Sequence, residues 1–354
     1  MIVRNKRGGA LELNIRLARE SDAPDIAGMI MKQHGVYYWS GGLSNVDFLR
    51  GAIKSGDLLI AVAELLNGAL AGITGANRKT ALEGAIELNM LIVQPKFRGF
   101  ALGKHLHNFL LETGALTGCA CVYTHCMTLD NASQRICAYM GHRFTGMLFN
   151  YHRFDGGAEN IAGAPLPYKG SGVVSCLPVD KKNAGEIYAP LKHAAFIEDV
   201  YHNLAADFTI MGEPEPKRPA ASRCSVIVRE KHRYCEALIE AIGGDAEEQI
   251  KRALENCGTL PGDSFNAFIN LNDPACPGLY DNMEKLGFVF SGLHPLTNAG
   301  EYMILYYAPG FSVDFEKIAV INEFSPKIAY IRGLFDLLQD SAAFRAPASS
   351  AVLN

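Results

Sequence analysis

The sequence has no long hydrophobic run and no cluster of basic residues. No stretch of about 18 consecutive apolar residues occurs in the 354, so a membrane-spanning helix is not expected. Lys and Arg number 33 against 37 Asp and Glu, giving a net charge of -4, and the basic residues do not gather in any segment. We therefore expect neither a membrane nor a nucleic acid as a partner. The length predicts two domains of ordinary size.

The chain also lacks a dense cysteine framework. It has nine cysteines, an odd number, scattered through segments that otherwise read as strands and helices. This pattern predicts reduced thiols in a cytoplasmic protein. Cys119, Cys121 and Cys126 lie close together, but their spacing matches no standard zinc pattern. We expect them to be buried structural cysteines, and we expect no metal.

Hydrophobic periodicity predicts a mixed α/β (α+β) fold in the first half. Strands with alternating or continuous apolar residues are interrupted by helical segments, and turn residues mark the boundaries. This order is typical of a central sheet flanked by helices. The predicted strands are 11–17, 58–65, 69–76, 85–93, 119–128 and 144–152, and the predicted helices run from 21 or 22 to 33, 46–54, 99–114 and 133–140.

The second half repeats parts of this pattern. The segment 155–171 is rich in Gly and Pro and is predicted to be a linker between domains 1–154 and 172–354. A strand is predicted at 172–179, at the start of the second domain. Gly141-His-Arg-Phe-Thr-Gly146 has a parallel in Gly287-Phe-Val-Phe-Ser-Gly292, each between a helix and a strand. We interpret this as a duplicated fold whose second copy has diverged. The alternative is coincidence, since a glycine between helix and strand is common.

A turn rich in small residues joins the strand ending at Val93 to the next helix. It reads Arg98-Gly-Phe-Ala-Leu-Gly103, followed by Lys104. Small residues let the backbone approach a ligand closely, and the free N–H groups at the start of a helix suit a pyrophosphate. The two basic side chains add positive charge. The alternative is an ordinary tight turn with solvated Arg and Lys.

This segment resembles the acetyl-CoA-binding motif of the GNAT N-acetyltransferase superfamily, Arg/Gln-x-x-Gly-x-Gly/Ala after a strand ending in Val-x-Pro. Arg98, Ala101 and Gly103 occupy the three positions, with Ala101 in place of the usual glycine. The segments 15–23 and 130–141 are similar to the family's first strand and helix and to its last helix. The resemblance covers about residues 12–152 and implies a GNAT fold with acetyl-CoA as co-substrate. It places CoA on Leu91, Ile92, Val93, Arg98, Gly99, Phe100, Ala101, Leu102, Gly103, Lys104, Asn131 and Ser133.

The resemblance implies an N-acyltransferase in which an amine attacks the thioester directly. Some family members use a Glu at the position of Glu87 as general base; the alternative is a solvent-facing carboxylate. The family usually carries a Tyr four residues before the glycine that ends the last helix, where this sequence has Cys137. A small helix shift would bring Tyr139 there; otherwise Cys137 or water protonates the thiolate, or no acid exists. His125 is a further titratable candidate, or else a core histidine.

The second half is predicted to hold no CoA. Its counterpart of the phosphate loop, 242–245, precedes a helix whose first turn carries Asp245, Glu247 and Glu248, which would repel a pyrophosphate. We expect one CoA site per chain, and a second lobe that shapes the acceptor cleft. The acceptor is expected to be a small-molecule amine or a protein amine, with Tyr37, Tyr38 and Trp39 near it or simply packed. The sequence leaves a homodimer open, and also a CoA-sensing or protein-interaction module with weak catalysis.

Overall fold

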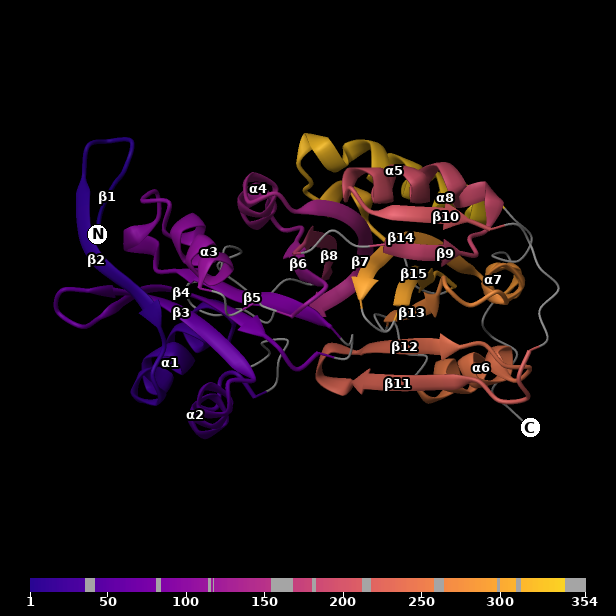
Figure 1. Cartoon of the computed structure of the whole chain (residues 1–354), viewed down its shortest axis with the longest axis horizontal. Helices are drawn as coiled ribbons and strands as arrows, with labels where there is room; N and C mark the ends of the chain where they lie inside the picture. The colour runs from indigo at the N-terminus through magenta and orange to yellow at the C-terminus, as the bar shows by residue number, and fades with distance from the viewer. Residues whose placement is uncertain are drawn as a thin grey trace.

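The computed structural model describes residues 1–35, 42–80, 84–113, 116, 118–153, 168–179, 183–211, 218–257, 264–297, 300–309 and 313–340. Within them a single mixed sheet of 13 strands runs through both halves of the chain, in the order β1-β2-β3-β4-β5-β6-β8-β7-β14-β15-β13-β12-β11. The first half lies at one end of the molecule and the second half at the other (Figure 1). None of the helices in the described ranges is long and apolar enough to cross a membrane.

The first half follows the predicted order of elements closely, which confirms a mixed sheet flanked by helices. The short strand β1 was not predicted. The strands are β1 (Ile2–Arg4), β2 (Ala10–Leu17), β3 (Leu58–Leu65), β4 (Leu70–Asn77), β5 (Ala85–Val93), β6 (Cys121–Met127) and β7 (Arg143–Arg153). The helices are α1 (Ala23–His34), α2 (Val46–Ser55), α3 (Leu102–Glu112) and α4 (Ala132–Tyr139).

Alternation along β3 produces a separate core on each face of the first lobe's sheet. Ala61 and Ala63 belong to the core that α3 covers, whereas Ile60 and Val62 belong to the core beneath α1 and α2. Successive side chains of a strand point to opposite faces, so a strand covered on both sides is apolar throughout. Figure 1 shows α3 on one side of the sheet and the α1–α2 pair on the other.

Strand β8 (Lys169–Pro178) completes the sheet of the first lobe. It lies between β6 and β7 and pairs antiparallel with both. The predicted boundary at residue 172 falls inside this strand, so the strand that was expected to open the second lobe belongs structurally to the first. Periodicity identified the strand, but it could not show which sheet the strand enters.

The second lobe repeats the topology of the first. Its order β11-β12-β13-β15-β14 matches β4-β5-β6-β8-β7, with the same antiparallel, parallel, antiparallel, antiparallel succession. The strands are β11 (Arg223–Arg229), β12 (Tyr234–Ala241), β13 (Ser264–Asn270), β14 (Phe288–Thr297) and β15 (Gly300–Tyr307). A separate parallel pair, β9 (Asn183–Ile187) and β10 (Asp207–Ile210), was not predicted. The helices are α5 (Ala194–Asn203), α6 (Ala246–Asn256), α7 (Cys276–Lys285) and α8 (Ser325–Asp340).

The two lobes meet where β7 crosses β14, and the repeated glycines lie at that crossing. Gly146 pairs with Gly292, and a Cβ built on Gly292 would lie 2.2 Å from the Cα of Gly146. Gly292 also has a φ of +119°, a conformation that favours glycine. The parallel sequences around Gly146 and Gly292 therefore correspond to equivalent positions in the two lobes, in direct contact.

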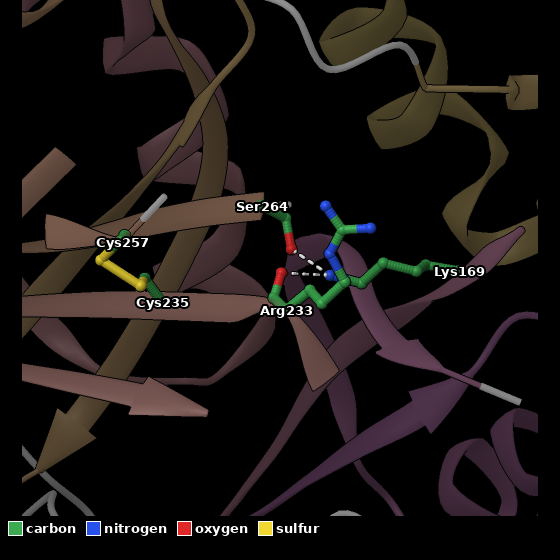
Figure 2. Close-up of a disulfide and its surroundings, with 5 residues drawn as sticks. All are labelled: Lys169, Arg233, Cys235, Cys257 and Ser264. Atoms are coloured by element: carbon green, nitrogen blue, oxygen red, sulfur yellow. Dashed lines mark hydrogen bonds between the residues drawn. A yellow bond between two sulfur atoms is a disulfide. The ribbon is translucent and has the colours of Figure 1, made fainter. Parts of the chain in front are cut away.

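A lysine and a disulfide stabilise the second lobe's side of the junction (Figure 2). The Nζ of Lys169, at the start of β8, donates to the carbonyl of Arg233 at 2.8 Å and to the Oγ of Ser264 at 2.6 Å. Nearby, Cys235 and Cys257 form a disulfide between β12 and the end of α6. The prediction that all nine cysteines are reduced is therefore wrong for this pair, because folding brings together two thiols 22 residues apart.

Candidate active site

Strands β5 and β6 separate partway along their length. They pair in parallel only from Ala85 to Glu87, opposite Cys121 to Tyr123, and then diverge. A register shift on the β4 side accompanies the divergence, and Met90 there has a φ of +53°. Such a bulge bends its strand and interrupts strict alternation. The side chains from Glu87 to Val93 therefore share one face by a period of two only up to the bulge.

The divergence opens a cavity of about 160 Å³, called the splay cavity here. Residues from α1, β4, β5, β6, α3, α4 and β7 line it. Leu91, Ser133 and Cys137 are among the predicted residues that reach it. The full lining is His34, Thr74, Glu87, Leu88, Asn89, Met90, Leu91, His107, Thr124, His125, Cys126, Met127, Ser133, Cys137, Tyr151 and His152.

The predicted phosphate loop, 98–103, has residues with positive φ at Gly99 and Ala101, just before α3 begins. Ala101 is the N-cap of α3 and has a φ of +55°, so the residue that replaces the family's glycine adopts a glycine-like conformation. Its methyl group cannot cap the helix, which leaves the first N–H groups of α3 for another acceptor. Gly99 has a φ of +89° and open space around it. Arg98 bonds to the carbonyl of Val93 and to the side chain of Gln33.

Tyr139 does not face the splay cavity. Its side chain is 67% exposed, and its hydroxyl accepts a hydrogen bond from Lys104. It lines a hollow on the outer side of α4 together with Asn131. Tyr139 lies about 200° around the helix from Cys137, so the helix presents the cysteine to the cavity and the tyrosine to solvent. The expectation that a small shift brings Tyr139 inward is wrong.

Cys137 is 4% exposed and lies 3.5 Å from the sulfur of Cys126. The hydrogen bond with Cys126 and burial raise the pKa of the Cys137 thiol well above its usual value. A thiol in this state is protonated at neutral pH and is a poor nucleophile. Its position beside the cavity therefore suits packing or proton donation.

Glu87 occupies the point where β5 and β6 diverge. Its side chain is 16% exposed, and burial raises its pKa to about 7 despite the nearby charge of Arg229. A carboxylate with a pKa near 7 can accept a proton from an attacking amine at neutral pH. The Nδ1 of His125, on the facing strand, lies 3.8 Å from its Oε1.

His125 contacts a tyrosine that the sequence analysis missed. The Nδ1 of His125 and the hydroxyl of Tyr151 are 3.1 Å apart. Burial lowers the pKa of His125 to about 3, so its ring is neutral at pH 7. Tyr151 comes from β7, just after Asn150, whose φ is +47° within a register shift. No motif marks Tyr151, and a bulge of this kind cannot be read from alternation.

A second cavity of about 150 Å³ lies between the lobes and is called the interlobe cavity here. The first lobe supplies residues around Glu87, and the second lobe supplies one face of β11, β12 and β13. Glu87, His125 and Tyr151 line both cavities. The lining is Asn77, Lys79, Thr80, Glu87, Tyr123, His125, Tyr151, Ser225, Ile227, Arg229, Glu236, Leu238, Phe268 and His294.

The equivalent position in the second lobe is closed. Strands β12 and β13 stay paired from Tyr234 and Ser264 to Ile239 and Ile269, so no splay opens along these six pairs. The counterpart loop at 242–245 is hydrogen-bonded to another segment of the second lobe. The Oδ1 of Asp245 accepts hydrogen bonds from the backbone N–H and the hydroxyl of Ser222. The described part of the second lobe therefore lacks the opening seen between β5 and β6, and a single CoA site per chain stays a prediction.

Three residues predicted near the acceptor, Tyr37, Tyr38 and Trp39, lie outside the described residues. Among the described side chains, no group of three or more His, Cys, Asp or Glu is arranged to hold a metal ion.

Comparison with known proteins relates part of the first lobe to a family. Residues 38–141 match the model of the acetyltransferase (GNAT) family. A ribosomal-protein-alanine N-acetyltransferase from Brucella melitensis is 18% identical, with 47% of this chain and 100% of that chain covered and a TM-score of 0.38. An N-acetyltransferase from Staphylococcus aureus is 16% identical, with 48% and 99% covered and a TM-score of 0.39. No curated protein sequence matches the chain. Over residues 38–141 the chain is thus similar to the acetyltransferase (GNAT) family.

Proposed function

We propose that this protein is an acyl-CoA-dependent N-acyltransferase. In this proposal the first lobe binds one acetyl-CoA, or a similar acyl-CoA, and the acceptor amine enters through the interlobe cavity. The observation that carries the proposal is the shared wall: Glu87, His125 and Tyr151 line both cavities. A thioester in the splay cavity and an amine in the interlobe cavity would meet at these three side chains.

The residues of the splay cavity fit the arm of CoA. The Oδ1 of Asn89 is buried in the cavity wall and has no hydrogen-bond partner among the described residues. Buried polar atoms are normally satisfied, so this oxygen suits an amide N–H of the pantetheine arm. The free N–H groups at the start of α3, with Arg98 nearby, suit the pyrophosphate. Bound CoA would supply an acyl group activated as a thioester.

The chain's own residues can then move the protons. Glu87 accepts the proton of the amine as the new C–N bond forms and the C–S bond breaks. The Tyr151 hydroxyl donates a proton to the departing sulfur in this proposal, because Tyr151 is buried and lines both cavities. Burial and the nearby Glu87 raise its pKa well above the usual value, which keeps it protonated. His125, neutral and bonded to Tyr151, positions that hydroxyl.

Two measurements test the proposal. Calorimetric titration with acetyl-CoA is expected to show one site per chain, and two equivalent sites would contradict the closed second lobe. Release of CoA, followed with a thiol reagent over a broad amine panel, is expected to fall about a hundredfold or more in Glu87→Gln. Tyr151→Phe should lower kcat, whereas Tyr139→Phe should change it by less than about threefold because Tyr139 faces solvent.

One observation favours an alternative function. The family's usual tyrosine is absent from the cavity, which suits a CoA-sensing or protein-interaction module with weak catalysis. Binding of acetyl-CoA without release of CoA above background, for every amine tested, would support that alternative over the acyltransferase.

A further inference from the structure

The second lobe's contribution to the interlobe cavity divides into an apolar and a polar part. Ser225, Ile227 and Arg229 alternate along β11, so they share one face, and β12 continues that face with Glu236 and Leu238. The register places Ile227 beside Glu236 and Ser225 beside Leu238. The apolar part therefore consists of Ile227 and Leu238, together with Phe268 from β13.

The polar part places one guanidinium near two carboxylates. An Nη of Arg229 lies 3.9 Å from the Oε1 of Glu236, and the hydroxyl of Tyr234 donates to the other carboxylate oxygen at 3.1 Å. The charge of Arg229 also acts on Glu87 across the cavity. A guanidinium has five N–H donors in a fork that matches a carboxylate, so Arg229 can bind a ligand carboxylate in addition to its partners within the chain.

Two histidines that line this cavity, His125 and His294, have buried ring nitrogens. Both ring nitrogens of His294 and the Nε2 of His125 lack a hydrogen-bond partner within the described part of the chain. His294 is 1% exposed, and its ring lies 6.1 Å from that of His125. Buried polar atoms without partners are rare in folded proteins, so these nitrogens point to a polar group of a ligand or to ordered water.

We propose that the acceptor is an α-amino acid with an apolar side chain. This inference rests on the proposed acyltransferase function and names its substrate class. The amine lies at Glu87 and His125, where the two cavities meet, and the carboxylate on the adjacent atom binds Arg229. The side chain packs against Ile227, Leu238 and Phe268. A volume of about 150 Å³ is below the roughly 300–1,000 Å³ of pockets for drug-sized ligands, which favours a free amino acid over a peptide.

A matched set of acceptors tests this inference on the unmodified protein. Leucine, leucinamide and 3-methylbutylamine share one apolar group and one primary amine, but only leucine has the carboxylate. With acetyl-CoA as donor, kcat/KM for leucine is expected to exceed that for the other two by about tenfold to a hundredfold, the range for a hydrogen bond to a charged group. Serine, which lacks the apolar group, is expected to be a weaker acceptor than leucine.

The variants assign the preference to one side chain. Arg229→Gln should bring the ratio of leucine to leucinamide close to one. A ratio within one variant cancels any effect of the lost charge on Glu87. Arg223→Gln on the same strand is the matched control, since the Arg223 side chain is 69% exposed and bonds to Glu240 away from the cavity. Arg223→Gln should keep the ratio of leucine to leucinamide seen in the unmodified protein. Arg229→Lys, which retains the positive charge, should keep part of the preference for leucine.

These outcomes distinguish a failure of the amino-acid inference from a failure of the proposed acyltransferase function. If leucinamide or 3-methylbutylamine equals leucine, or if only polyamines or peptide amines release CoA, the amino-acid inference is overturned and the acyltransferase stands. The amino-acid inference is also overturned, and the acyltransferase stands, if Arg229→Gln keeps the preference for leucine over leucinamide. If acetyl-CoA binds but no amine releases CoA, the acyltransferase proposal fails and the inference fails with it.

Discussion

Gly292 offers a direct test of how the two lobes are held together. In Gly292→Ala the new methyl group would lie 2.2 Å from the Cα of Gly146 and 2.5 Å from the carbonyl oxygen of Thr145. Both are backbone atoms, so no side chain can rotate away. Alanine would also have to adopt a φ of +119°. The substitution therefore combines a steric overlap with backbone strain. Both act at the Gly146–Gly292 pair, which joins β7 to β14 in the described part of the chain.

Two further variants separate these contributions. Gly185→Ala carries the backbone strain alone, because Gly185 has a φ of +73° and nothing within 4 Å of its Cβ position. We expect it to lower the free energy of unfolding by about 1–3 kcal/mol. Gly146→Ala carries the overlap alone, with contacts of 2.9 Å to the nitrogen of Leu293 and 3.1 Å to the Cα of Gly292. Overpacking of this kind costs about 1–3 kcal/mol.

Gly292→Ala should cost about 3–6 kcal/mol, since it combines both terms and its overlap is closer. That is a large share of the roughly 5–15 kcal/mol that stabilises a typical folded protein. Urea unfolding followed by far-UV circular dichroism measures the three midpoints and their slopes. If Gly292→Ala is no less stable than Gly185→Ala, the close approach of the strands does not hold the lobes together and the reasoning fails.

Three further predictions concern stability. Ala101→Gly should raise the free energy of unfolding by about 0.5–1 kcal/mol in the same urea assay, because glycine adopts a φ of +55° without strain; a loss would contradict this. Cys257→Ser should lower it by about 3 kcal/mol, and a reducing agent should destabilise the parent protein equally but leave the variant unchanged. Burial lowers the pKa of His107 to about 4, so the unfolded chain takes up the proton first, and about 3 kcal/mol of stability should be lost as pH falls from 6.5 to 4. His107→Gln should reduce that slope in thermal unfolding scans; an unchanged slope would mean that other groups dominate.

Much of the fold could be predicted from local patterns. Strand β5 was predicted at residues 85–93, as the structure has it, and most other elements lie within a few residues of their predicted bounds. These predictions succeed because the alternation of strands and the spacing of helical apolar residues are local properties. The glycines at 141 and 146 and their counterparts at 287 and 292 indicated a repeat for the same reason.

The candidate site could be predicted only in part. The loop at 98–103 and the position of Glu87 follow from a short motif at a strand–helix turn. Tyr151 could not be found in this way, because a bulge at Asn150 precedes it and no motif includes it. Tyr139 had the expected residue type, but the rotation of α4 directs it to solvent.

The sequence by itself determined the order of elements, the turn of small residues at 98–103 and the acidic first turn of the helix that follows Asp245. Only the tertiary structure decided that β8 enters the first lobe's sheet, that Cys235 bonds to Cys257, and that second-lobe residues line the interlobe cavity. The physical reason is distance along the chain. Periodicity and turn chemistry act over a few residues, whereas these contacts join segments whose meeting depends on how whole lobes pack.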